Sequence, residues 1–249
     1  AKRGALFMVD LQEAVQKQGY QVAHIKTDSI KVPNITPEIV QFVEDFGKKY
    51  GYSFEHEATY DRMCLVNDAV YVAKYDEEWA PKNKITGEKE YWTATGTQFA
   101  VPYVFKSLFS KEPIVFKDLC EVKSVTSAMY LDMNKNLPED QHDLRFIGGV
   151  GLFCPMQDDA ISGVLLRTGE SAKTGETTYS AVIGTKGYRW LESETVSELK
   201  LEDKVDRSYY DSLVLKAVKS ISEYGDFEWF VSEDPVVSVG HPDEQAPWE

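Results

Sequence analysis

The first 75 residues repeat one order of patterns, helix and then hairpin, and this order strongly limits the folds open to the chain. Apolar side chains recur at helical spacing within residues 2–18, and Gly19 suits a helix end. Thr36 suits an N-cap and Pro37 a first helical position, and the residues that follow form one apolar face. We therefore predict two helices, each followed by strand-like sequence.

Both strand-like regions have the pattern of a hairpin. Residues 20–26 and 30–32 flank the polar turn at residues 27–29. Residues 54–66 read as a second strand, half-exposed over residues 54–60, which turns and returns along residues 69–75. Helix, hairpin, helix, hairpin predicts an α+β fold, in which an antiparallel sheet has its helices packed on one face.

The remaining sequence divides by composition into a loop, an aromatic-rich region, a linker, a strand-rich region and a final helix. In that order they are residues 76–90, residues 91–131 with a helix after Pro102, residues 132–143, residues 145–190, and residues 207–224. We predict a short strand at residues 227–231 and a loose acidic tail at residues 241–249.

Composition indicates a soluble globular protein, with 43% hydrophobic and 27% charged residues. No apolar run approaches the roughly 20 residues that a membrane span needs, and no signal sequence is evident, so we expect a cytoplasmic protein without membrane contact. Cys64, Cys120 and Cys154 form no CxxC pair, which favours buried free thiols over a disulfide framework or a zinc site.

The negative charge lies mostly in the second half of the chain. The formal net charge is -14, which argues against a surface that binds nucleic acid all over. Residues 1–131 carry a net charge of -2, whereas residues 132–249 carry -12. The first half can therefore still present a basic groove.

The turn Lys26-Thr27-Asp28-Ser29 holds the strongest candidate for a catalytic residue. A carboxylate at the tip of a tight hairpin is held rigidly, and Mg²⁺ prefers one or two carboxylates together with substrate phosphates. Taken alone, an Asp-Ser turn is usually no more than an ordinary turn.

Residues 22–31 resemble the DTDS hairpin of phage-type family B DNA polymerases, and residues 54–71 resemble the second hairpin that follows in that family. Both motifs occur in the family's order, with a helix between them, and the resemblance covers about residues 1–75. It implies the end of a polymerase palm at residues 1–90, with a palm-like antiparallel sheet. A thumb-like region with a linker would occupy residues 91–140, and a smaller, acidic, mixed α/β C-terminal domain residues 141–249.

By this resemblance, Asp28 is the catalytic residue and a ligand of Mg²⁺ in the complete polymerase, and Lys26, Thr27 and Ser29 lie against nucleic acid. Two metal ions serve nucleotidyl transfer, and one carboxylate cannot hold both. The implied partners are primer–template DNA, a dNTP and the N-terminal polymerase portion, either a separate chain or a missing segment. The implied location is the cytoplasm of a bacterial host, from a phage or prophage.

Two departures from the family pattern affect the site. Lys26 stands where the family has the first aspartate of DTDS, and it suits either a phosphate contact or a solvated edge strand. The second hairpin reads Asp68-Ala-Val-Tyr71 where the family often has KKRY, so only Tyr71 carries over as a DNA contact. Tyr71 is otherwise a packed strand aromatic, and Lys74 is the candidate replacement for the lost lysines.

Later segments add weaker candidates. Residues 92–106 resemble the stretch in which phage-type members cross to the thumb, and their threonines suit either phosphate contacts or a buried loop. Lys186, Arg189 and Trp190 form a basic-aromatic cluster in the acidic half, a possible contact for nucleic acid or protein.

The leading hypothesis is a fragment or subunit of a template-directed DNA polymerase, active only when the N-terminal palm and fingers complete it. The main alternative is a non-catalytic remnant or protein-binding module of a replication complex, which Lys26 and the lost lysines favour. A third interpretation is a stand-alone metal-dependent hydrolase, for which Glu55 or Glu57 would have to join Asp28.

Overall fold

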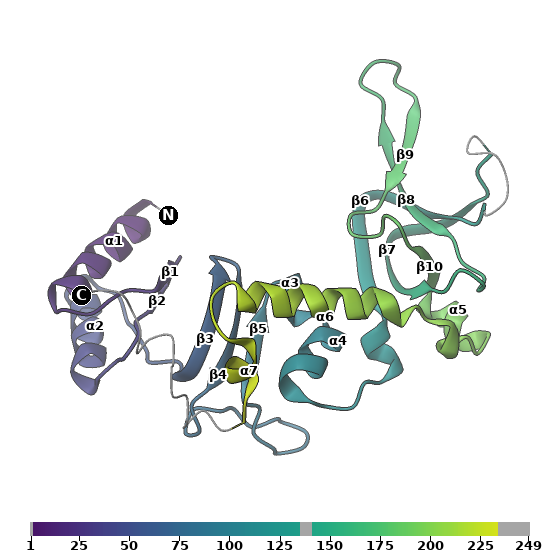
Figure 1. The fold of residues 1–249 in the computed structure, drawn as a ribbon. Helices are drawn as coiled ribbons and strands as arrows, with labels where there is room; N and C mark the ends of the chain where they lie inside the picture. The colour runs from purple at the N-terminus through teal and green to yellow at the C-terminus, as the bar shows by residue number, and fades with distance from the viewer. Residues whose placement is uncertain (1, 135–140, 234–249) are drawn as a thin grey trace. The chain divides into compact units, whose positions relative to one another are not determined.

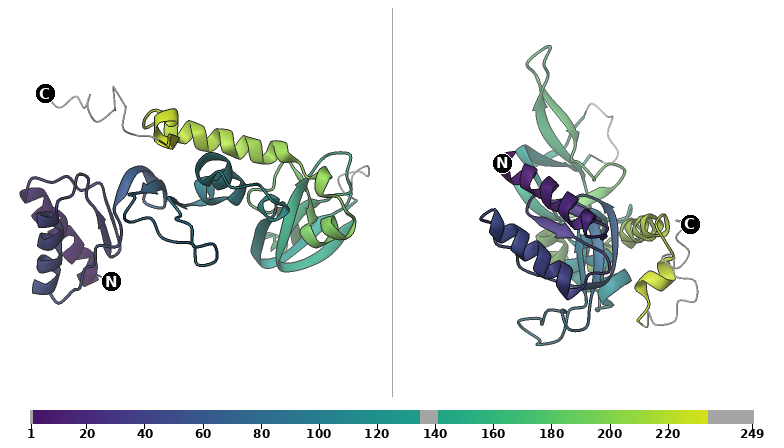
Figure 2. Two further views of the ribbon diagram at one scale, coloured as in Figure 1. Left: turned by 90° about the horizontal axis from the view of Figure 1, so that it is seen from below. Right: turned by 90° about the vertical axis from the view of Figure 1, so that its left-hand side faces the viewer.

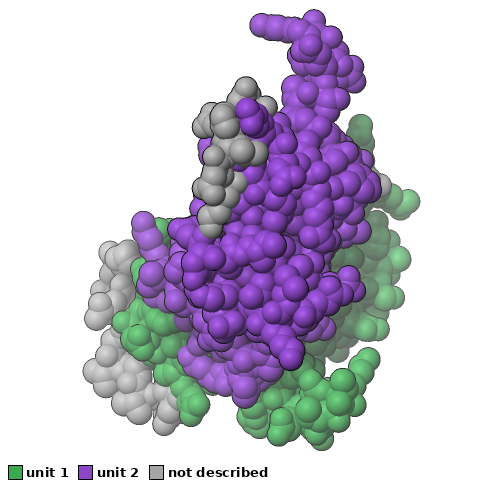
Figure 3. Space-filling model, turned by 90° about the vertical axis from the view of Figure 1, so that its right-hand side faces the viewer, with its two compact units in different colours: residues 1–99, 221–249 green, residues 100–220 purple. Residues whose placement is uncertain are grey.

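The computed structural model describes residues 2–134 and 141–233, and it confirms the α+β class with antiparallel sheets. The chain packs as two compact units, Ala1–Phe99 with Ile221–Glu249 (unit 1) and Ala100–Ser220 (unit 2), which Figure 3 colours separately. These units are defined by packing alone. The predicted functional domains, with boundaries at residues 90 and 140, therefore stay a prediction. No helix in the described ranges is long and apolar enough to cross a bilayer.

Unit 1 begins with the predicted order of helix, hairpin and helix. These elements are α1 (Lys2–Lys17), β1 (His24–Lys26), β2 (Ser29–Lys31) and α2 (Pro37–Lys49). The two helices lie side by side (Figures 1 and 2). The buried side chains of α1 are Phe7, Met8, Leu11 and Val15. They form one stripe, which packs on the apolar side chains of the hairpin and of α2, so the helices cover one face of the hairpin as predicted.

The rest of unit 1 is a separate three-stranded antiparallel sheet and two short helices. These elements are β3 (Tyr60–Asn67), β4 (Val70–Tyr75), β5 (Trp92–Thr95), α3 (Thr97–Ala100, its last residue in unit 2) and α7 (Phe227–Val231). The strand order is β3-β4-β5, and within the described residues β1 and β2 pair only with each other. The expectation of one palm-like sheet containing both hairpins is therefore wrong. β1 and β2 have three residues each. Their apolar side chains pack on the helices, and the two strands do not extend the β3-β4-β5 sheet.

Two predicted strands of unit 1 are also wrong. Residues 54–59 are not in a strand, and the alternating burial there arises because Phe54 packs into the core of α1 and α2. Residues 227–231 form helix α7, because the carboxylate of Asp226 accepts a hydrogen bond from the amide of Trp229 at 2.6 Å and caps the helix.

Unit 2 contains a five-stranded antiparallel sheet between helical segments. The helical segments before the sheet are α4 (Pro102–Phe105), the π-helix η1 (Lys106–Ser110) and the 3₁₀-helix η2 (Phe116–Leu119). The strands are β6 (Glu121–Asp132), β7 (Leu144–Met156), β8 (Val164–Glu170), β9 (Thr177–Ala181) and β10 (Arg189–Glu192). The helices that follow are α5 (Ser193–Glu198), the 3₁₀-helix η3 (Glu202–Lys204) and α6 (Arg207–Ser222), whose last two residues belong to unit 1. The strand order is β10-β7-β6-β8-β9 (Figure 1), which confirms the strand-rich region and both predicted helices.

The predicted linker at residues 132–143 instead joins two strands of one sheet, since β6 and β7 pair in antiparallel register with Asp132 opposite Leu144. Asp132 anchors the described ends of this connection. It accepts hydrogen bonds from the amides of Asn134 and Asp143 and from His142 Nδ1 at 2.7 Å. Burial raises the pKa of Asp132, but these hydrogen bonds outweigh it and hold that pKa below its ordinary value. Residues 135–140 and the predicted tail lie outside the described residues.

Candidate nucleic-acid interface

Asp28 lies at the tip of the hairpin formed by β1 and β2, where its side chain is exposed. The turn is tight, because the amide of Asp28 donates to the carbonyl of Lys26 at 2.6 Å and Ser29 Oγ donates to the same carbonyl at 3.3 Å. Thr27 has a φ of 50°, a left-handed conformation that costs a β-branched residue of the order of 1 kcal/mol. The local sequence thus holds one carboxylate and its neighbour Lys26 outward on a short, strained turn.

Asp28 offers a single carboxylate at this turn. In the part of the chain that the structure describes, no group of three or more His, Cys, Asp or Glu residues is placed to hold a metal ion. A Mg²⁺ ion keeps several waters and takes one or two carboxylates together with phosphates, so Asp28 alone would supply at most one of its protein ligands. Glu55 and Glu57, on which the hydrolase interpretation depends, are exposed in a segment outside any strand and build no such group with Asp28.

The two hairpins on which the family resemblance rests contact each other within unit 1. Lys31 Nζ lies over the ring of Tyr71, 5.5 Å from its centroid. His24 Nε2 lies 3.7 Å from Asp68 Oδ1 in the turn between β3 and β4. His24 is buried, and neither of its ring nitrogens has a hydrogen-bond partner, whereas the Asp68 side chain is almost fully exposed. A lysine and a tyrosine from separate hairpins therefore share one surface.

Tyr71 belongs to a group of three half-buried tyrosines on one side of the β3-β4-β5 sheet, which we call the tyrosine face (Tyr60, Tyr71 and Tyr75). Tyr60 is paired with Tyr75 across the strands, and their ring centroids are 5.1 Å apart. Burial raises the pKa of Tyr60, and the neighbouring phenols of Tyr71 and Tyr75 raise it further. Opposite Tyr71 on β5 is Thr95. Half-exposed aromatic rings on a sheet are suited to stacking against nucleic-acid bases.

Lys74 lies on the other side of this sheet, so the prediction that it replaces the lost lysines beside Tyr71 is wrong. Side chains three positions apart on a strand point to opposite faces. Lys74 is paired with Arg62 and Trp92, and its Nζ donates to the carbonyl of Glu233 at 3.4 Å. Burial, and then the charge of Arg62, lower the pKa of Lys74. The sequence reasoning missed Lys31, which occupies the place predicted for Lys74.

The prediction of a surface contact cluster at Lys186, Arg189 and Trp190 is also wrong. Trp190 is fully buried in the core of unit 2, and its Nε1 donates to the carbonyl of Thr185 at 3.1 Å. Arg189 is half-buried and donates to Ser162, both to the hydroxyl and to the carbonyl. Lys186 alone is exposed, so these residues mainly stabilise the sheet.

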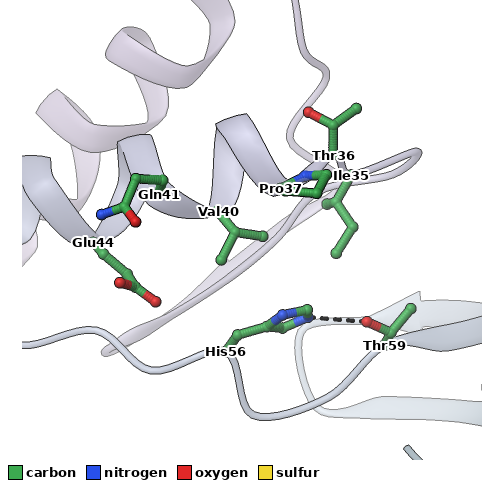
Figure 4. Close-up of a pocket in the computed structure, with 8 residues that line it drawn as sticks. All are labelled: Ile35, Thr36, Pro37, Val40, Gln41, Glu44, His56 and Thr59. Atoms are coloured by element: carbon green, nitrogen blue, oxygen red, sulfur yellow. Dashed lines mark hydrogen bonds between the residues drawn. The ribbon is translucent and has the colours of Figure 1, made fainter. Parts of the chain in front are cut away.

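A surface pocket of about 390 Å³ lies between the start of α2 and the segment before β3 (Figure 4). His56 Nε2 and Thr59 Oγ1 form a hydrogen bond of 2.9 Å at its edge, and the His56 ring packs on Trp79 with centroids 4.3 Å apart. Pro37 and Val40 form much of the opposite wall. A hydroxyl and an imidazole alone do not make a nucleophilic site, and among the described residues no carboxylate is hydrogen-bonded to His56 to orient it as a base. We interpret the pocket as a packing gap.

Comparison with known proteins adds no relative: no protein-family model, no curated protein and no solved structure matches this chain. The family B resemblance therefore stays a prediction.

Proposed function

We propose that this chain is a fragment or subunit of a family B-type, template-directed DNA polymerase, and that it contributes Asp28 and a surface for the primer–template duplex. The observation that carries the proposal is the contact between Lys31 and Tyr71, since it joins the two hairpins that resemble polymerase motifs. Neither hairpin alone is specific.

The residues of the proposed site have different chemical roles. Lys31 and the exposed Lys26 attract phosphates, which position DNA without reading its sequence. Tyr71 offers its half-exposed ring to a base or sugar beside them. Asp28 would hold one side of a Mg²⁺ ion, which would supply charge stabilisation for the attacking 3′-hydroxyl and the leaving pyrophosphate. A second carboxylate must come from another polypeptide portion, so the chain by itself is expected to bind DNA without extending it.

The alternative, a protein-binding module of a replication complex, is favoured by one observation in unit 2. Val122, Phe146 and Val150 are each more than 60% exposed on the β6 and β7 strands of its sheet. Val122 and Val150 are diagonal neighbours across the two strands, since Val122 opposes Leu152 and Val150 opposes Ser124, and exposed apolar neighbours on a sheet can form a protein contact. This alternative requires neither Asp28 nor Tyr71.

The proposal predicts which variants weaken binding to a primer–template duplex. Tyr71→Leu is expected to lower affinity about tenfold, because stacking of an unpaired base, such as one in the template overhang, on an aromatic ring contributes roughly 1–3 kcal/mol. Lys31→Gln is expected to weaken binding and to reduce the slope of log affinity against log salt by about one phosphate contact. Fluorescence anisotropy of a labelled duplex at several salt concentrations measures both effects.

Lys74→Gln is the matched control for charge, because Lys74 lies on the opposite side of the same sheet. Tyr224→Leu is the control for loss of an exposed ring in the same unit. Both controls are expected to bind the duplex as the parent chain does. A Lys74→Gln variant that binds more weakly than Lys31→Gln would overturn the assignment of the tyrosine face.

A further inference from the structure

Unit 2 brings two of the three cysteines into contact. Cys120 follows η2 and immediately precedes β6, and Cys154 lies on β7. The Sγ atoms of Cys120 and Cys154 are 3.4 Å apart, and both residues are buried free thiols, as the sequence predicted. Glu121 and Phe153 form the last pair of the β6–β7 ladder, and Cys120 and Cys154 are the positions that directly extend it. Opposed residues in such a ladder have Cα atoms about 4.5–5.5 Å apart, within the range that a disulfide spans.

We propose that Cys120 and Cys154 form an oxidisable dithiol, which a hydroperoxide converts into an intramolecular disulfide. The inference does not depend on the polymerase function.

The roles of the two thiols differ. Cys120 is the slightly more exposed one, and its thiol also lies 3.3 Å from the carbonyl of Phe116, to which it donates. The hydrogen bond from the Cys154 thiol lowers the pKa of Cys120, which favours the thiolate at that sulfur. Cys154 is fully buried, and the interaction with Cys120 raises its pKa. Cys120 is therefore the sulfur that reacts first, and Cys154 resolves the product.

The chemistry balances with hydrogen peroxide as the oxidant. The Cys120 thiolate attacks one peroxide oxygen, the O–O bond breaks, and the products are a sulfenic acid on Cys120 and, after protonation, one water. The Cys154 sulfur then attacks the sulfur of the sulfenic acid, the S–S bond forms, and hydroxide leaves and takes the Cys154 proton as a second water. Two thiols lose two electrons to one peroxide, and a dithiol reductant reverses the change.

The test is differential alkylation of the whole chain before and after exposure to hydrogen peroxide. The chain is then denatured, labelled, cut with trypsin and analysed by mass spectrometry. Cleavage after lysine and arginine places Cys120 in residues 118–123, Cys154 in residues 146–167 and Cys64 in residues 63–74. The expected product is a linked pair of the first two peptides that lacks two hydrogens, while Cys64 remains alkylatable because no thiol faces it. The oxidised chain is expected to run as a monomer without reductant and to unfold at a higher temperature.

Variants make the assignment specific. Cys64→Ser is expected to keep the linked pair, and both Cys120→Ser and Cys154→Ser are expected to lose it. Peptide mapping of the parent chain needs no variant, so the test stands even if a serine variant fails to fold. Two results would overturn the proposal: all three thiols staying alkylatable under peroxide that oxidises a reference peptide thiol, or Cys120 advancing to sulfinic acid without any link to Cys154.

Discussion

Replacing Arg62 by methionine is expected to lower the free energy of unfolding of unit 1 by about 3 kcal/mol, because a buried, charged donor is lost. Arg62 is only 6% exposed and holds α7 against the β3-β4-β5 sheet. Its Nη1 donates to the carbonyls of Trp229 at 2.7 Å and Phe230 at 3.1 Å, and its Nε donates to Asp61 at 2.8 Å. The guanidinium also lies over the ring of Trp229, 5.1 Å from its centroid.

Methionine keeps much of the volume of arginine but leaves both carbonyls without this donor. Urea unfolding followed by tryptophan fluorescence measures the loss, and the two-unit architecture calls for separate fitting of each transition. Arg145→Met is the matched control, because Arg145 is exposed and pairs with Glu192 at the surface. Such a pair contributes no more than about 1 kcal/mol. Equal losses for the two variants would show that Arg62 does not hold α7.

Trp190→Ala is expected to lower the free energy of unfolding of unit 2 by about 4 kcal/mol, in the range typical of a large side chain removed from a core. Trp190 is fully buried, its ring packs edge-on against Tyr209 with centroids 5.3 Å apart, and Lys123 Nζ lies 4.8 Å from its centroid. Alanine leaves a cavity there and leaves the carbonyl of Thr185 without the indole donor.

Measurements of thermal unfolding and of DNA binding distinguish a buried Trp190 from the surface contact cluster that the sequence predicts. Lys186→Ala removes an exposed charge from the same segment and is expected to change stability by less than about 0.5 kcal/mol. Trp190→Phe keeps most of the ring volume, so its loss of stability is expected to lie between those of Lys186→Ala and Trp190→Ala. A Trp190→Ala chain with nearly unchanged stability and weakened DNA binding would restore the idea of a surface contact.

The periodicity of apolar residues predicted much of the fold. It failed where side chains alternate in burial but the backbone does not pair in a sheet. The helices at residues 2–18 and 37–50 were visible because each is long enough for its apolar stripe to repeat. The alternation at residues 54–60 reported correctly that Phe54 is turned inward, but burial against helices produces the same pattern as a strand does. Residues 227–231 are too few for a period to appear, and their aromatic composition outweighed the capping signal of Asp226.

The candidate site was predictable in part. Asp28 and Tyr71 came from local motifs, and the structure places both on hairpins of unit 1. Lys74 could have been excluded from strand alternation alone, since an odd separation from Tyr71 places the two on opposite faces. Lys31 could not have been chosen, because its place over Tyr71 depends on how two separate hairpins pack. The prediction for Trp190 failed because the sequence alone does not distinguish a buried indole from an exposed one when charged residues lie nearby.

The central claim is that Asp28 belongs to a polymerase site that another polypeptide portion completes. The most direct measurement is primer extension with Mg²⁺ and dNTPs, in which this chain is mixed with the polypeptide carrying the N-terminal palm and fingers motifs from the same genome. Asp28→Ala is compared with Asp10→Ala, an exposed aspartate on α1. We predict extension that requires both polypeptides, falls about a hundredfold or more with Asp28→Ala, since metal-ion catalysis contributes several kcal/mol, and is unchanged with Asp10→Ala. Full extension with Asp28→Ala, or without this chain, would contradict the account and leave the protein-binding module in its place.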